Sequence, residues 1–157
     1  MTTHVALDGD TGIVITRRLA APPALVFRAH LEPELIRRWM VGPAGWTMPV
    51  CTSDPRTGGA FRFEWRGPAG ESFHATGEFI GLTPDTRIEH VERMFLPDPT
   101  PDNRVVTELE PDGGHTRLTV RMRLADAAAR EVVMESGMID GLEGAYAALE
   151  TLADEVA

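Results

Sequence analysis

Hydrophobic and polar residues alternate through much of the middle of the chain. Phe61, Phe63 and Trp65 are separated by charged residues, and this period of two places the three aromatic side chains on one face of a strand. Other stretches rich in β-branched and aromatic residues are bounded by Gly, Pro and Asp. Together they predict strands over residues 13–19, 46–52, 61–66, 72–82, 87–95, 104–110 and 116–124.

Two short helices are predicted between the first and second strands. A proline pair ends the first strand, and proline suits the first turn of a helix, so a helix is expected over residues 24–31. A second helix is expected to begin at Pro33 and to end at Trp39. Glycine and proline within residues 42–45 then indicate a loop that returns the chain to the sheet.

A long helix is predicted for the end of the chain, over residues 126–156, with Asp126 as its N-cap. Apolar residues recur on one side of it at spacings of three and four: Met138, Leu142, Ala145, Leu149, Leu152 and Val156. Gly137, Gly141 and Gly144 interrupt this stripe, and each costs about 1 kcal/mol relative to alanine in a helix interior. Such a cost indicates either close packing or free space beside the helix.

The order of these elements predicts an α+β fold. Successive strands are joined by short turns, so the sheet is expected to be antiparallel. A curved sheet of six to seven strands, wrapped around the long C-terminal helix, would bury the apolar side of both. Residues 1–157 fit a single domain, in which residues 1–10 are expected to be a flexible N-terminal segment.

Composition argues against several classes of partner. The net charge is −9, from 24 acidic and 15 basic residues, and every basic residue is arginine. Net acidity opposes binding to nucleic acids and to anionic membranes, both of which need a basic face. No apolar run is long enough to span a membrane, and the polar first residues are not typical of a signal peptide. The single cysteine, Cys51, cannot form an intramolecular disulfide, so a cytoplasmic location is expected.

Short motifs are spread over residues 12–153. They lie at residues 16–22 with Val26 and Phe27, at 33–35 with Trp39, and at 54–59, 77–79, 113–118 and 136–142. Together these motifs resemble the START-like (SRPBCC) helix-grip superfamily, and within it the Hsp90 ATPase activator homologue-like group. The resemblance implies the helix-grip fold, in which a cavity lies between the curved sheet and the last helix. None of these motifs is a catalytic signature, and the fold hosts many unrelated functions.

The chain departs from that group at two positions of the expected cavity wall. The group commonly has tryptophan after the glycine of the final helix, where this chain has Leu142 after Gly141. It often has a Thr-Trp pair in a later strand, where this chain has Val91 and Glu92. Both differences imply a pocket of a different shape, with more polarity than is usual in the group.

The strand over residues 87–95 carries the main polar candidates. Ile88, His90, Glu92 and Met94 share one face, which the resemblance places inside. His90 and Glu92 would then lie close together in an apolar cavity, as candidates for general acid and base. Two alternatives remain: a satisfied polar pair with no catalytic role, or a register shifted by one residue that turns both side chains outward.

A metal site is the weaker interpretation of these polar residues. His74 would add a third ligand if it faced inward. The apolar neighbours Phe73 and Ala75 compete for that inner face, so no metal and no cofactor are predicted. The remaining histidines are expected at the surface: His4, His30 and His115.

The expected ligand site combines the aromatic strand, the polar pair and the last helix. Its predicted lining residues are Trp39, Phe61, Phe63, Trp65, His90, Glu92, Met122, Met138, Gly141, Leu142 and Tyr146. Apolar pockets with a few polar groups are typical of small-molecule sites. The first hypothesis is therefore binding of a small apolar or aromatic molecule.

Two other functions are compatible with the resemblance. One is a polyketide cyclase/aromatase-like enzyme that uses the same pocket, with His90 or Glu92 as acid or base. The other is an Hsp90-type chaperone-partner domain, which rests on the shared fold alone. A homodimer is compatible with the sequence, although no exposed apolar stripe favours it.

Overall fold

Residues 2–156 of the computed structural model form eight strands and four helices. The strands are β1 (His4–Asp8), β2 (Gly12–Leu19), β3 (Thr47–Ser53), β4 (Ala60–Arg66), β5 (Ser72–Thr83), β6 (Arg87–Phe95), β7 (Asn103–Asp112) and β8 (His115–Arg123). The helices are α1 (Pro23–Ala29), α2 (Pro33–Trp39), α3 (Ala127–Glu135) and α4 (Leu142–Val156). All strands belong to one antiparallel sheet in the order β1-β2-β8-β7-β6-β5-β4-β3. The predicted helix-grip fold is confirmed, with a larger sheet than the six to seven strands expected.

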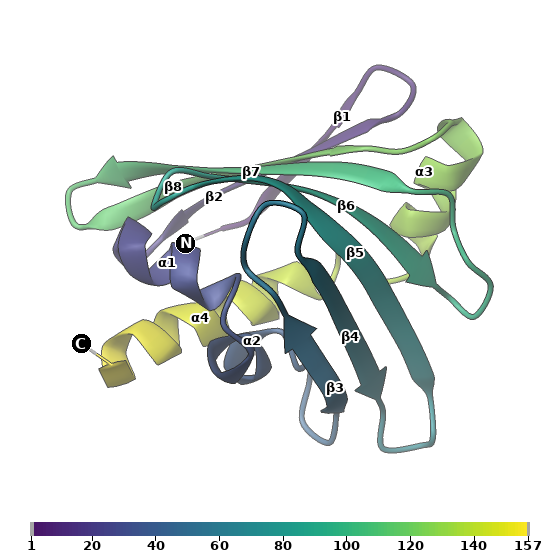
Figure 1. The fold of residues 1–157 in the computed structure, drawn as a ribbon, viewed down its shortest axis with the longest axis horizontal. Coiled ribbons are helices and arrows are strands. Elements are labelled where there is room, and N and C mark those ends of the chain that lie inside the picture. The colour runs from purple at the N-terminus through teal and green to yellow at the C-terminus, as the bar shows by residue number, and fades with distance from the viewer. Residues whose placement is uncertain (1, 157) are drawn as a thin grey trace.

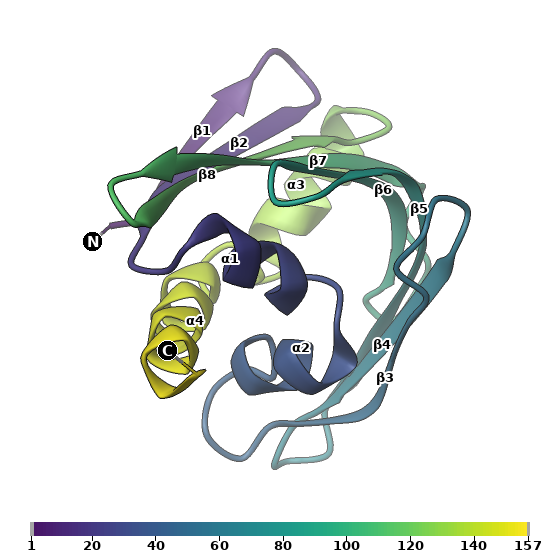
Figure 2. The ribbon, with the colours of Figure 1, turned by 60° about the vertical axis from the view of Figure 1, so that its left-hand side comes forward.

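The sheet curls around α1, α2 and α4, which lie on its concave side (Figure 1, Figure 2). Two clusters of buried residues follow from this arrangement. In the first, Leu149 and Leu152 of α4 are buried with residues of β2 and β8, such as Ile13. In the second, Ile36 of α2 is buried with aromatic residues of β4 and β5, such as Phe61. The C-terminal helix therefore packs against one half of the sheet, and the short helix α2 against the other.

Residues 4–8 form the strand β1, within the segment 1–10 that the sequence predicted to be flexible; Met1 lies outside the described residues. β1 pairs with β2 along its whole length. The side chains of β1 are exposed, so its residues show no buried face that a pattern could reveal. Gly9 takes a φ of +58° in the turn between the two strands, a conformation that glycine adopts without strain. Backbone pairing through this tight turn joins residues 4–8 to the sheet.

The helix predicted over residues 126–156 is in fact two helices. Asp126 caps α3 as expected, because its Oδ1 accepts a hydrogen bond from the backbone N–H of Ala129 at 2.8 Å. Gly137, with a φ of +86°, then turns the chain before α4 begins. The apolar spacing continues across this break, so the pattern alone did not show it.

The break changes the stripe predicted on the last helix. Leu149 and Leu152 are fully buried, but Met138 lies in the turn between the helices and Val156 is 46% exposed.

Among residues 2–156, no helix has both the length and the apolar character needed to cross a membrane.

The aromatic face of β4 depends on a glycine in the next strand. Phe61 and Gly77 are cross-strand partners. A Cβ atom on Gly77 would lie 2.1 Å from the Phe61 ring and 2.4 Å from the carbonyl oxygen of Val91. The Phe61 ring also contacts Phe63 and Phe79, with centroid distances of 5.1 and 5.2 Å. The missing side chain at residue 77 therefore provides the space that the ring occupies over β5.

We predict that Gly77→Ala lowers the free energy of unfolding by about 2 kcal/mol, because it forces the Phe61 ring and the sheet backbone apart. Gly81→Ala is the matched control on the same strand, since a Cβ there meets no atom within 4 Å. The control should change stability by less than about 0.5 kcal/mol. Urea denaturation measures both, and equal losses in the two variants would contradict this packing argument.

Candidate functional site

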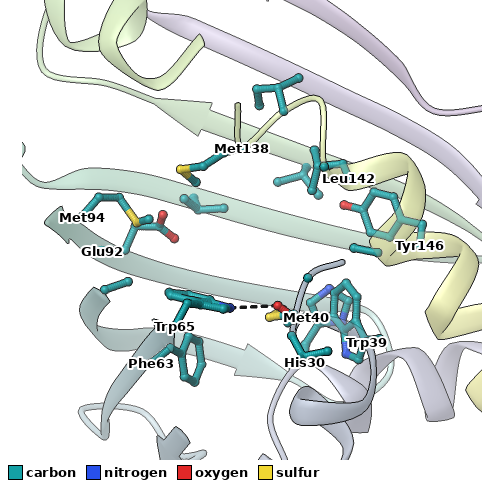
Figure 3. Close-up of a pocket in the computed structure, with 18 of the residues that line it drawn as sticks. His30, Trp39, Met40, Phe63, Trp65, Glu92, Met94, Met138, Leu142 and Tyr146 are labelled. Atoms are coloured by element: carbon teal, nitrogen blue, oxygen red, sulfur yellow. Dashed lines mark hydrogen bonds between the residues drawn. The ribbon is translucent and has the colours of Figure 1, made fainter. Parts of the chain in front are cut away.

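A cavity of about 810 Å³ lies between the concave face of the sheet and the helices (Figure 3). Strands β4, β5 and β6 form one wall, and residues of β2, β7 and β8 continue it. The opposite side is formed by α4 and the turn at residues 136–141. The loop after α2 adds residues 40–43 and Trp46. The cavity thus occupies the space in front of the half of the sheet that α4 does not cover.

The residues predicted to line a ligand site all lie in the wall of this cavity. They are Trp39, Phe61, Phe63, Trp65, His90, Glu92, Met122, Met138, Gly141, Leu142 and Tyr146. The alternation of β5 and β6 adds further wall residues that the sequence analysis did not single out as ligand contacts: Phe73, Ala75, Phe79, Ile88 and Met94. That these side chains bind a ligand stays a prediction.

Aromatic rings form a continuous group along β4 and β5. The centroids of Phe63 and Trp65 are 6.0 Å apart, and those of Trp65 and Phe73 are 4.8 Å apart. The indole N–H of Trp65 donates to the carbonyl oxygen of Met40 at 2.9 Å (Figure 3). The indole N–H of Trp39 donates to the carbonyl oxygen of Ala29 at 2.8 Å. Because both indole donors are occupied by backbone, the two rings offer a ligand apolar carbon surface.

His90 and Glu92 lie in the wall, between Ile88 and Met94 on the same face of β6. Of the two strand registers that the sequence left open, this is the one in which both side chains face inward. Nε2 of His90 and Oε1 of Glu92 are 2.6 Å apart, and the side chains are 17% and 15% exposed. Because the carboxylate oxygen can only accept, the histidine donates through Nε2, and Nδ1 of a neutral ring is left as an acceptor. Such a pair can orient a ligand or transfer a proton.

His74 does not join this pair. It follows Phe73 and precedes Ala75, both of which line the cavity, so its side chain lies on the other face of β5. There its ring stacks on Phe95, with centroids 4.1 Å apart. Within the part of the chain that the structure describes, no group of three or more His, Cys, Asp or Glu residues is placed to hold a metal ion.

His30 is a wall residue that the sequence analysis placed at the surface, and that prediction was wrong. Its Nδ1 donates to the carbonyl oxygen of Val26 at 2.7 Å, and its ring lies 4.9 Å from that of Trp39. Burial, with a smaller contribution from His90, lowers the pKa of His30 to about 4. The imidazole is therefore neutral near pH 7. Its position depends on how α1 and α2 pack together, which no local pattern in the sequence signals.

Tyr146 connects the cavity to the buried charge that anchors α4. Its ring stacks on Trp39 with centroids 5.9 Å apart, and the guanidinium of Arg17 lies 5.8 Å from its centroid. Burial raises the pKa of Tyr146, so the phenol stays protonated and able to donate a hydrogen bond. Arg17 is itself 4% exposed and forms ion pairs with Glu143 and Glu150 of α4. The sequence pattern gave no indication of these two ion pairs.

Comparisons with known proteins agree with this fold. The model of the family described as activator of Hsp90 ATPase homolog 1-like protein matches residues 20–154. A structure from Rhodobacter sphaeroides is 30% identical, with a TM-score of 0.87 over 96% of this chain and 97% of that one. One from Nitrosomonas europaea is 28% identical, with a TM-score of 0.81 over 95% and 97%. One from Mycobacterium smegmatis, 24% identical, shares the fold with a TM-score of 0.85 over 96% of each chain. No curated protein matches the chain significantly.

We predict that His30 makes the protein less stable in mild acid. Its pKa is about 4 in the folded protein, against about 6.5 in an unfolded chain, so the unfolded chain binds more protons between these values. The free energy of unfolding therefore falls as the pH decreases through this window. Because one side of the ring faces the cavity, we expect His30 to account for a loss of about 1 kcal/mol between pH 7 and pH 5.

The variant His30→Asn isolates this contribution. It keeps a donor near the position of Nδ1 but removes the titrating ring, so the variant should lose about 1 kcal/mol less than the wild type over the same pH range. Urea denaturation at both pH values makes the comparison. Identical pH dependence in the two proteins would show that His30 is not the group responsible.

Proposed function

The chain belongs to the family of activator of Hsp90 ATPase homolog 1-like proteins, and we propose that it uses the cavity of this fold to bind a small apolar or aromatic molecule. The observation that carries this proposal is the cavity of about 810 Å³ with its aromatic wall. Pockets that hold drug-sized ligands measure about 300–1,000 Å³ and are mostly apolar, with few polar groups. Here the aromatic rings would supply the apolar contact, and His90, Glu92 and Tyr146 the polar groups that set orientation.

Burial of the ligand's apolar surface would drive binding. A four-ring aromatic probe that buries about 400 Å² of apolar surface gains about 10 kcal/mol from its removal from water. Part of this gain is lost because the bound ligand gives up translational and rotational freedom. Micromolar affinity for a generic aromatic probe is the expectation that follows.

We predict that pyrenemethanol, a neutral fluorescent aromatic alcohol, binds the wild-type protein and that Gly144→Phe weakens this binding about tenfold. Gly144 lies in the cavity wall, and a Cβ on it meets no atom within 4 Å. A phenyl group there occupies free space instead of displacing the core. The substitution also replaces a glycine in the first turn of α4 with a better helix former, so the variant is expected to fold.

The matched control is Ala147→Phe, on the same helix at an exposed position outside the wall. It should bind the probe as the wild type does. Fluorescence titration measures all three proteins. An absence of binding to the wild type, or equal affinity in the wild type and Gly144→Phe, would contradict the proposed cavity site.

The hydrogen bond between His90 and Glu92 favours one alternative, a polyketide cyclase-like enzyme that uses the same cavity. The carboxylate of Glu92 lies in the cavity wall, where it can act as a general base on a bound molecule. The histidine bonded to it can return a proton to the product. This alternative therefore requires Glu92 to accept a proton from a bound aromatic molecule.

Nitrobenzisoxazole provides a simple test of that chemistry. When a base removes its ring C–H proton, the N–O bond breaks and a coloured cyanonitrophenolate forms. If the pair is catalytic, we predict that Glu92→Gln lowers the rate about tenfold or more, while Glu131→Gln, which is exposed on α3 outside the wall, leaves it unchanged. Equal rates in the wild type and Glu92→Gln would exclude Glu92 as the base.

The name of the family refers to activators of the Hsp90 ATPase, which is the origin of the chaperone-partner alternative. The ATPase rate of purified Hsp90, with and without this chain, tests it directly.

A cytoplasmic location also belongs to the proposal. It is supported by Cys51, which is buried and whose thiol pKa is raised by that burial, so the residue is suited to remain a reduced core side chain.

A further inference from the structure

The formal charges in the cavity wall are negative. Glu92 and Asp140 are wall residues, and within residues 2–156 none of the 15 arginines is. The sequence contains no lysine. Arginines lie elsewhere in ion pairs, as Arg93 does with Asp102 at 2.8 Å. Apart from the two histidines, of which His30 is neutral near pH 7, the described part of the wall offers a ligand no side chain that can carry a positive charge.

Glu92 has hydrogen-bonding capacity that the protein does not use. Its Oε1 accepts from His90, and its Oε2 accepts no hydrogen bond from any residue between 2 and 156. Asn103, the partner of Glu92 in the pairing of β6 with β7, is 1% exposed. Neither the oxygen nor the nitrogen of its amide has a partner in the described part of the chain. Of these two residues only Glu92 lies in the cavity wall, so its Oε2 is the acceptor that a ligand can reach, whereas the amide of Asn103 leaves one donor and one acceptor unpaired among residues 2–156.

The aromatic wall favours the same sign of ligand charge. The faces of aromatic rings carry negative charge density and attract cations, most strongly at tryptophan. The indole N–H groups of Trp39 and Trp65 are bonded to backbone carbonyls, so the attraction of these two residues for a ligand comes from their ring faces. Figure 3 shows Trp65 and Glu92 on the same side of the cavity, across from Met138, Leu142 and Tyr146.

We propose, on the basis of the ligand binding proposed above, that the preferred ligand is a protonated amine with an apolar or aromatic body. Its ammonium group donates to Oε2 of Glu92, and its body lies against the rings of β4. A neutral ligand without a donor leaves Oε2 unpaired. A carboxylate or phosphate approaches Glu92 with no arginine to balance it, and an unpaired charge in an apolar cavity is costly. Fatty acids and other anionic amphiphiles are therefore disfavoured.

Three pyrene derivatives that share one ring system test this assignment: pyrenemethylamine, pyrenemethanol and pyrenecarboxylate. We expect the amine to bind the wild type about tenfold more tightly than the alcohol, and the carboxylate to bind more weakly than the alcohol. The ratio of the alcohol dissociation constant to the amine dissociation constant is then about ten in the wild type, and in Glu92→Gln it falls to about one. In Glu131→Gln, which makes the same charge change outside the cavity, the ratio stays at about ten.

The outcomes separate this inference from the function on which it rests. If no probe binds, the proposed function fails. If the alcohol binds but the amine binds no better, or the carboxylate binds best, the cavity site stands and the amine assignment is overturned. A tenfold preference that persists in Glu92→Gln removes the role of Glu92. Should that variant fail to fold, the three affinities of the wild type still decide the ligand class.

Discussion

The place of α4 depends on the buried guanidinium of Arg17. This residue lies on β2, its side chain is 2% exposed, and it pairs with Glu143 at 3.0 Å and Glu150 at 2.8 Å. A buried charge is tolerated only when it is paired, so these contacts favour the position of α4 over the β2 half of the sheet. The concave face of β4, β5 and β6 is therefore not covered by α4. The cavity is the space that results, and the apolar face of those strands forms one of its walls.

Features that depend on local periodicity were predictable from the sequence. An alternation of two residues placed Phe61, Phe63 and Trp65 on one face and placed His90 beside Glu92, and the cavity wall contains all five. Features that depend on contacts between distant segments were not predictable. The pairing of β1 leaves no buried pattern, and the place of His30 depends on helix packing. The apolar spacing in residues 126–156 fits one helix as well as two, and only the positive φ of Gly137 distinguishes them.

The two departures from the group that the sequence resembles both fall in the cavity wall. Leu142 and Glu92 stand where that group commonly has tryptophan, and each is smaller, so both leave more volume. Glu92 also brings a carboxylate into an apolar environment, which lowers stability unless hydrogen bonds compensate. His90 supplies one such bond, to Oε1. A ligand that donates to Oε2 would supply another, which links the polarity of this wall to ligand choice.

Methionine methyl groups offer a direct view of whether the cavity binds a ligand. Met40, Met94, Met122 and Met138 lie in its wall, whereas Met48 and Met134 do not. Aromatic ring currents shift the NMR signals of methyl groups close to a bound pyrene. In a titration with pyrenemethanol, we predict saturable shifts at the four wall methyls and none at Met48 or Met134. Shifts confined to the exposed Met134, or of equal size at all six methyls, would contradict binding inside the cavity.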